Sequence, residues 1–171
     1  MTATHPVILA TLAATLMAGA PSIQAKPKTT TDALDCVGRY AKSGNCDWNH
    51  WSELWDACSV ASFPALNDDD FLLNKVKSGL CTSTAWPDLE LLVNYREQPP
   101  ANLDESVNCV SRYAHMNICD WDHWSEMAKT CNTIYTELAK DDFLLNKVKG
   151  GECTWDNWSN LFNEIYVPLP H

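Results

Sequence analysis

The chain has 171 residues, eight cysteines and a formal net charge of −10 at pH 7. This acidic balance argues against nucleic acid or an anionic lipid surface as a partner, because both attract basic proteins. An even number of cysteines in a small exported chain is typical of a disulfide framework. The C-x2-C spacing of common zinc sites does not occur in the sequence, so we expect disulfides and no metal site.

The N-terminal segment is apolar and, apart from His5, has no ionisable side chain through residue 25. Its apolar run over residues 7–20 is too short for a transmembrane helix, which needs about 20 apolar residues. We expect residues 1–25 to be a secretory signal peptide cleaved before Lys26. No later stretch of the sequence is apolar enough to span a bilayer, so the sequence predicts a secreted protein without a membrane span.

The remaining chain contains one pattern twice. The landmarks of residues 36–58 recur 73 residues later over 109–131, and the heptapeptide FLLNKVK at 71–77 is repeated identically at 143–149. The cysteine spacings are C-x9-C-x11-C-x22-C and C-x9-C-x11-C-x21-C. Two copies are too few for a solenoid, so we expect a duplicated small domain.

The domain boundaries follow from this repeat. We expect a first copy over residues 26–95 and a second copy over residues 105–171. Residues 96–104 between them have linker composition, and Pro99-Pro100 prevents continuation of a helix.

Apolar residues within each copy have helical spacing, which predicts an all-α fold of two tandem, disulfide-linked four-helix modules. In the first copy we expect helices near residues 33–40, 47–58 and 70–77 and from Trp86 onward. Asp47 is placed to cap the second helix, and glycine follows the third. In the second copy one face of the last helix is expected to carry Trp158, Leu161, Phe162 and Ile165.

The expected helices restrict the disulfide pairing. If residues 47–58 form one helix, Cys46 and Cys58 lie about 18 Å apart along its axis, beyond the roughly 7 Å Cα limit of a bridge. Antiparallel packing of neighbouring helices then favours Cys36–Cys58 with Cys46–Cys81. By repetition, the second copy is expected to pair Cys109–Cys131 and Cys119–Cys153.

Asp47, His50 and Glu53 are three residues apart, and the second copy repeats this spacing. A histidine one turn from a carboxylate can bind a metal or transfer protons. Acidic residues at the start of a helix also have a purely structural role as caps, and we favour that interpretation. No motif such as H-E-x-x-H, G-x-S-x-G or a P-loop occurs, so we expect no enzymatic activity and no cofactor.

Six of the eight tryptophans form matched pairs across the copies, and we expect them to pack in the core. The pairs are Trp48 with Trp121, Trp51 with Trp124, and Trp86 with Trp158. Trp55 and Trp155 have no counterpart, which makes them candidate partner contacts. Asn157 begins an Asn-Trp-Ser sequon and is a candidate glycosylation site.

A signal peptide followed by compact cysteine-rich repeats resembles the small secreted effectors of filamentous plant pathogens, fungal or oomycete. The segment from Cys58 to Cys81 and Trp86 is also similar to part of the oomycete elicitins, which are helical sterol carriers and defence elicitors. Elicitins have six cysteines per domain, whereas each copy here has four. These resemblances imply secretion, entry into host cells for some effectors, and sterol binding for elicitins.

Three functional hypotheses follow. The leading one is a secreted, non-enzymatic effector or virulence-type protein that binds a host or environmental macromolecule, most simply a protein, through an exposed face. The alternative is an elicitin-like carrier of sterol or lipid, with an apolar cavity lined by Trp51, Leu72, Val76 and Leu92. The third is a secreted hydrolase or metal enzyme that uses the Asp-His-Glu spacing.

Overall fold

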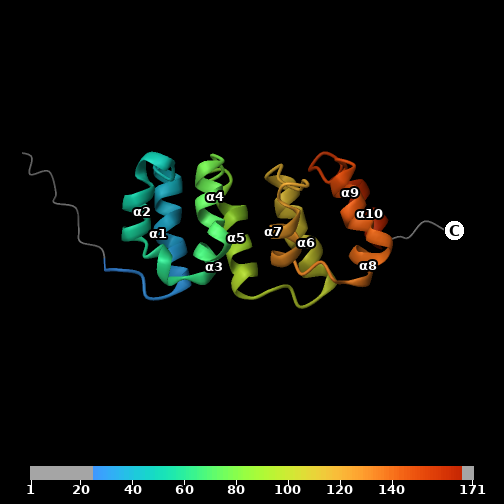
Figure 1. Ribbon diagram of the computed structural model, residues 1–171, viewed down its shortest axis with the longest axis horizontal. Coiled ribbons are helices and arrows are strands. Elements are labelled where there is room, and N and C mark those ends of the chain that lie inside the picture. The colour runs from blue at the N-terminus through green and yellow to red at the C-terminus, as the bar shows by residue number, and fades with distance from the viewer. Residues whose placement is uncertain (1–24, 167–171) are drawn as a thin grey trace, which may run out of the picture.

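The computed structural model describes residues 25–166, except for the side chain of Thr136, and in this range it contains helices and no strands. The predicted signal peptide falls almost entirely on residues 1–24, outside the described residues. Within the described range no helix is long and apolar enough to cross a bilayer. The helices stand side by side in one row along the long axis of the molecule (Figure 1).

Within residues 25–166, each half of the chain has five α-helices. The first half contains α1 (Thr30–Ser43), α2 (Trp51–Ala57), α3 (Pro64–Asn67), α4 (Phe71–Lys77) and α5 (Trp86–Glu97). The second half contains α6 (Leu103–His115), α7 (Trp124–Thr130), α8 (Thr136–Ala139), α9 (Phe143–Lys149) and α10 (Trp158–Tyr166). The expected count of four helices per copy missed the single-turn helices α3 and α8, which are too short to show a periodic pattern.

Short 3-10 turns lie between several of these helices. They span Trp48–His50, Val60–Ser62, Asp68–Asp70 and Lys140–Asp142. Helices α5 and α6 extend into the expected linker of residues 96–104, so that the stretch between the two helices is residues 98–102.

Local sequence explains where the helices begin and end. Thr29 and Asp32 form a capping box at the start of α1. The Asp47 side chain accepts hydrogen bonds from the backbone N–H groups of Asn49 and His50, as predicted for a cap. The element that it caps is the 3-10 turn before α2 and not α2 itself. Gly79 follows α4 with φ of 72°, a left-handed conformation that glycine adopts without a steric penalty.

Four disulfides have the predicted connectivity. Cys36–Cys58 and Cys109–Cys131 have Cα–Cα distances of 5.4 and 5.3 Å, and each ties the first helix of a copy to the end of the second. The other two bridges, Cys46–Cys81 and Cys119–Cys153, each have a Cα–Cα distance of 5.5 Å and join two interhelical connections. A bridge of this kind stabilises a small domain by about 2–4 kcal/mol.

The core is built from equivalent apolar residues of the two copies. They include Val37, Leu54, Leu72, Val76 and Leu89 in the first half and Val110, Met127, Leu144, Val148 and Leu161 in the second. On α10, Leu161 and Ile165 are buried as predicted, but Phe162 is exposed and lies against Tyr166, with ring centroids 4.7 Å apart. The predicted apolar face of α10 is therefore narrower than its spacing suggested.

The two halves pack directly against each other. Helix α5 contacts α1 and α3 of its own half and also α6 and α7 of the other half. Buried residues of both halves belong to one continuous cluster. The short connection therefore joins two segments that share an interface.

Candidate functional site

Trp48 and Trp121 are exposed, at 59% and 57% of their surface, so the expectation that they pack in the core was wrong. The prediction assumed one continuous helix from residue 47 to 58. Trp48 instead lies in a 3-10 turn, which advances about 120° per residue rather than 100° and turns its side chain away from the apolar face of α2.

Each exposed indole is paired with a lysine from the repeated heptapeptide. Lys77 Nζ lies 5.4 Å from the Trp48 ring centroid, and Lys149 Nζ lies 5.0 Å from that of Trp121. A cation over an aromatic ring is attracted to it by about 0.5–1 kcal/mol at an exposed site. The two pairs are equivalent in the repeat and hold their indoles in similar environments.

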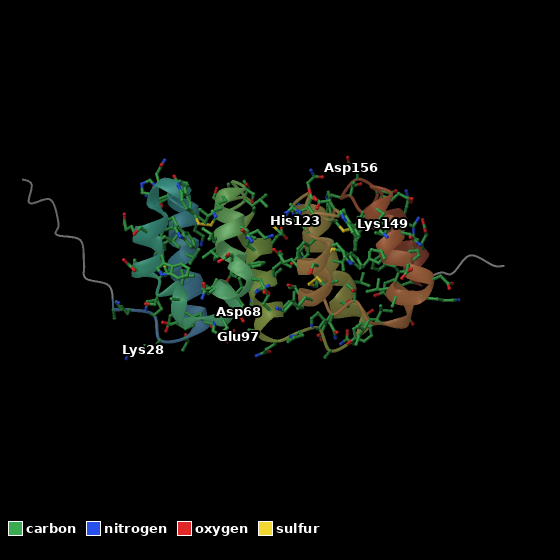
Figure 2. All side chains as sticks on the ribbon, in the orientation of Figure 1. Lys28, Asp68, Glu97, His123, Lys149 and Asp156 are labelled. Carbon is green, nitrogen blue, oxygen red and sulfur yellow. A yellow bond between two sulfur atoms is a disulfide. The ribbon has the colours of Figure 1, made fainter. Side chains whose placement is uncertain are left out.

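These pairs lie along one edge of the molecule. The α1–α2, α4–α5, α6–α7 and α9–α10 connections all lie at the upper edge in Figure 1. Figure 2 shows His123, Lys149 and Asp156 at this edge. We call it the tryptophan edge and define it by the following side chains: Trp48, Lys77, Trp121, Lys149 and Trp155.

The unmatched tryptophans lie in two different places. Trp155 is 49% exposed on the tryptophan edge, and its ring meets that of His115 edge-on at a centroid distance of 4.6 Å. Trp55 is half-buried on α2, with its ring centroid 5.2 Å from that of Trp51. The two candidate partner contacts therefore do not form one surface.

The repeated Asp-His-Glu residues do not converge. His50 Nδ1 lies 2.9 Å from Asp47 Oδ1, and this hydrogen bond is the main cause of the lowered pKa of Asp47. Glu53 instead accepts a hydrogen bond from Tyr40 at 2.9 Å. Nowhere in residues 25–166 do three or more His, Cys, Asp or Glu side chains gather as a metal site would require.

The residues expected to line an apolar cavity are part of the packed core. Leu72, Val76 and Leu92 are 1%, 3% and 0% exposed, and half-buried Trp51 packs against the same cluster. Val76 also borders an open hollow of about 420 Å³ near the Cys46–Cys81 bridge. That hollow opens to solvent, and polar side chains such as Lys42 and Asp47 line it together with apolar ones.

A buried ionic cluster joins the two halves, and the sequence did not reveal it. Lys75 of α4 is 1% exposed, and its Nζ lies 2.7 Å from Glu126 Oε1 on α7. The same carboxylate accepts a hydrogen bond from Tyr113 Oη at 2.9 Å. Burial, together with the nearby Glu126, raises the pKa of Tyr113 well above 10.0. Lys75 also lies over the ring of Phe71, 5.2 Å from its centroid.

A second polar group lies on the same interface. Asp88 of α5 is buried and bonds His115 Nδ1 at 2.6 Å and Arg112 Nη1 at 3.4 Å, both on α6. Lys129 of α7 reaches Asp69 at 2.6 Å, and its hydrogen bond is the main cause of the lowered pKa of Asp69. These contacts join polar side chains of the two halves at several points, which fixes the register of the halves.

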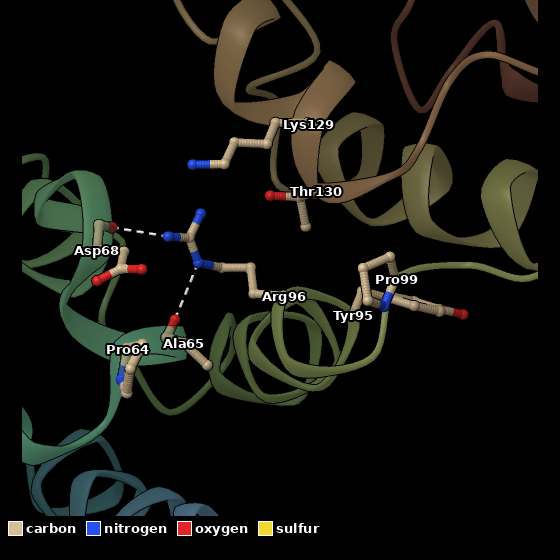
Figure 3. Close-up of a pocket in the computed structure, with 8 residues that line it drawn as sticks. All are labelled: Pro64, Ala65, Asp68, Tyr95, Arg96, Pro99, Lys129 and Thr130. Carbon is tan, nitrogen blue, oxygen red and sulfur yellow. Dashed lines mark hydrogen bonds between the residues drawn. The ribbon is translucent and has the colours of Figure 1, made fainter.

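We call the interface between the two halves the junction. A small hollow of about 150 Å³ lies at the junction (Figure 3). Arg96 dominates it, and its guanidinium donates to the backbone carbonyls of Ala65 at 2.9 Å and Asp68 at 2.7 Å. Lys129 and Thr130 approach from α7 (Figure 3). Because Arg96 already holds the chain around α3, we interpret this hollow as a structural feature of the junction.

Asn157 lies just before α10 and is half-buried. Its side-chain amide donates to the Glu152 carbonyl at 3.0 Å and accepts a hydrogen bond from Asn160 at 2.8 Å. The amide nitrogen that a glycan would modify is therefore engaged in the folded chain.

Comparison with protein-family models, curated proteins and solved structures finds no match to this chain.

Proposed function

We propose that this chain is a secreted, non-enzymatic binding protein of the effector or virulence type, built from two tandem helical modules. It acts by binding a host or environmental macromolecule through the tryptophan edge. The observation that carries the proposal is the repetition of one exposed tryptophan and lysine pair, Trp48 with Lys77 and Trp121 with Lys149. Both pairs lie where interhelical connections meet one edge of the molecule (Figure 1).

Exposed tryptophan in a restrained orientation suits recognition. Tryptophan is enriched among the residues that dominate binding energy, because it offers a large apolar area and one hydrogen-bond donor. The lysine beside each indole limits its motion, which lowers the entropy lost on binding. Two equivalent contacts on one body can also act together, so that the affinity of the pair exceeds that of either alone.

The disulfides support this role. Each copy has a small core, and small exported domains commonly depend on bridges for stability. Four bridges that hold the helices and connections leave exposed positions such as Trp48 and Trp121 unconstrained by folding.

Affinity capture from host extracellular fluid tests the proposal. The immobilised chain lacking residues 1–25 is compared with the double variant Trp48→Ala/Trp121→Ala and with the matched control Leu91→Ala/Ile134→Ala. The control removes two exposed apolar side chains that lie outside the tryptophan edge. We expect the tryptophan variant to capture roughly tenfold less partner protein than the wild-type chain, and the control variant to capture as much as the wild-type chain.

The same captured material is extracted for lipids and examined by mass spectrometry. A protein retained equally by both double variants would contradict binding through the tryptophan edge. A sterol recovered without any protein partner would contradict the proposal and favour the elicitin-like alternative.

A further inference from the structure

The free end of the first copy carries the same tyrosine and glutamate pair as the one whose glutamate binds Lys75 at the junction. Tyr40 Oη donates to Glu53 Oε1 at 2.9 Å, the same contact and distance as between Tyr113 and Glu126. Tyr113 is fully buried at the junction, whereas Tyr40 is half-buried and Glu53 is exposed. The pair on α1 and α2 is therefore accessible to a cation from outside.

The arginine beside this pair also recurs. Arg39 occupies the repeat position of Arg112, which lies 3.4 Å from Asp88 across the junction. Arg39 is exposed, and it forms no ion pair within residues 25–166. The outer surface of α1 and α2 thus presents Glu53, Tyr40 and Arg39 to solvent. Their equivalents on α6 and α7 contact α4 and α5 across the junction.

We propose that this surface, which we call the open face and define by Arg39, Tyr40, Glu53 and Asp56, docks a helical surface of another protein that presents a lysine to Glu53. The chemistry of the partner follows from the junction inside this chain. It needs a lysine in the role of Lys75 and a carboxylate opposite Arg39.

Charge at the rim of the open face adds a second requirement. Asp56 occupies the position of Lys129, which pairs with Asp69 at the junction. A partner therefore gains from a second cation opposite Asp56, where the junction has a carboxylate. The expected partner surface is basic overall, which also suits the net charge of −10 of this chain.

A second copy of this chain does not meet these requirements. Lys147, the equivalent of Lys75, is already held at 2.8 Å by both Glu152 and Glu164. Glu164 itself stands where the first copy has the fully buried Leu92. Burial of such a charge against the open face without a partner would be costly.

At the free, outer end of the second copy, two other residues also differ from their equivalents at the junction. Asn160 replaces the carboxylate of Asp88 that binds Arg112, and Asp141 would approach Asp56. The outer end thus has the character of a terminal repeat whose polar surface prevents further stacking.

An engineered copy of the chain can serve as the probe. The probe carries Asn160→Asp, Glu164→Leu and Asp141→Lys, which give the surface around Lys147 the groups required opposite Arg39, Glu53 and Asp56. It also carries Glu53→Lys, which blocks its own open face. Calorimetric titration of this probe into the wild-type chain is expected to give a one-to-one complex. The complex should weaken by roughly tenfold or more when the receiving chain carries Glu53→Lys, and should persist when it carries the remote control Glu137→Lys.

Each outcome decides the proposal. No complex with correctly folded probe at about 100 µM, or a complex unaffected by Glu53→Lys in the receiving chain, would overturn docking at the open face. Sedimentation of the wild-type chain alone is expected to show a monomer. A wild-type dimer that Glu53→Lys abolishes would assign the open face to a second copy instead of another protein. The tryptophan edge is not altered in any of these variants, so failure here leaves the proposed function standing.

Discussion

Lys75 and Glu126, which are 51 residues apart in the sequence, form a largely buried ion pair in which Nζ lies 2.7 Å from Oε1. The identical heptapeptide of the second copy places Lys147 in a different setting, where its side chain is 18% exposed and bonds Glu152 and Glu164. The same seven residues thus serve once as an interface and once as an outer surface.

Replacing Lys75 with methionine should destabilise the protein strongly. The substitution keeps most of the side-chain length but leaves the Glu126 carboxylate, which is 17% exposed, without its cation. Breaking a largely buried pair in this way costs about 3 kcal/mol. The measurement is the free energy of unfolding in urea. Lys147→Met is the matched control and should cost less than about 1 kcal/mol, because its ion pairs are partly exposed. Equal losses in the two variants would contradict a buried junction.

Gly38→Ala should destabilise the first copy. A Cβ atom at position 38 would lie 2.6 Å from Nε1 of Trp86, whose indole is 4% exposed and packed on all sides. Overpacking of this kind costs about 1–3 kcal/mol. The equivalent residue of the second copy is Ser111, and Ser111→Ala should change the thermal midpoint much less. A tolerated alanine at position 38 would show that Trp86 does not pack against this helix as described.

Stability should fall at alkaline pH because Tyr113 resists ionisation in the folded state. Its pKa is raised well above 10.0 by burial and by Glu126, so the stabilisation is complete below pH 10 and is lost as the pH rises toward the folded pKa. In Tyr113→Phe, the free energy of unfolding should fall less steeply between pH 10 and pH 11.5 than in the wild-type chain. Tyr40→Phe should reduce this slope less, since Tyr40 is less buried. An unchanged slope in Tyr113→Phe would contradict the buried position of this phenol.

Peptide mapping of the non-reduced protein should recover the four bridges Cys36–Cys58, Cys46–Cys81, Cys109–Cys131 and Cys119–Cys153. Removing one of them by a paired substitution, such as Cys46→Ala with Cys81→Ala, should lower the free energy of unfolding by about 2–4 kcal/mol. Recovery of reduced cysteines would contradict the proposed secretion, and recovery of a Cys46–Cys58 bridge would contradict the helix packing.

Local patterns predicted most of the helical skeleton. The cap at Asp47 and the helix end at Gly79 depend on residues close in sequence, so they can be predicted without knowledge of the fold. The disulfide pairing followed from the rise of a helix and from the antiparallel packing expected of neighbouring helices. The exposure of Trp48 could not be predicted in this way. A 3-10 turn in place of a turn of α-helix directs the Trp48 side chain to solvent instead of into the core.

The burial of Lys75 at the junction could not be predicted for a different reason. Lys75 and Lys147 have identical neighbours over seven residues, so no local pattern tells which is buried. The difference comes from Tyr113 and Glu126, which belong to the other copy. One signal was present in the sequence: Leu92 of the first copy is replaced by Glu164, a change that marks the outer end of the pair of repeats.

Acetylation of the folded protein with a lysine-selective reagent, read residue by residue by mass spectrometry, tests the central claim that the two copies form one body. Lys77 and Lys147 differ in exposure but both reach solvent, whereas Lys75 does not. We predict that Lys75 stays unmodified in the native protein, while Lys77 reacts quickly and Lys147 reacts at an intermediate rate. Modification of Lys75 as fast as Lys77 in folded, disulfide-bonded protein would contradict the account.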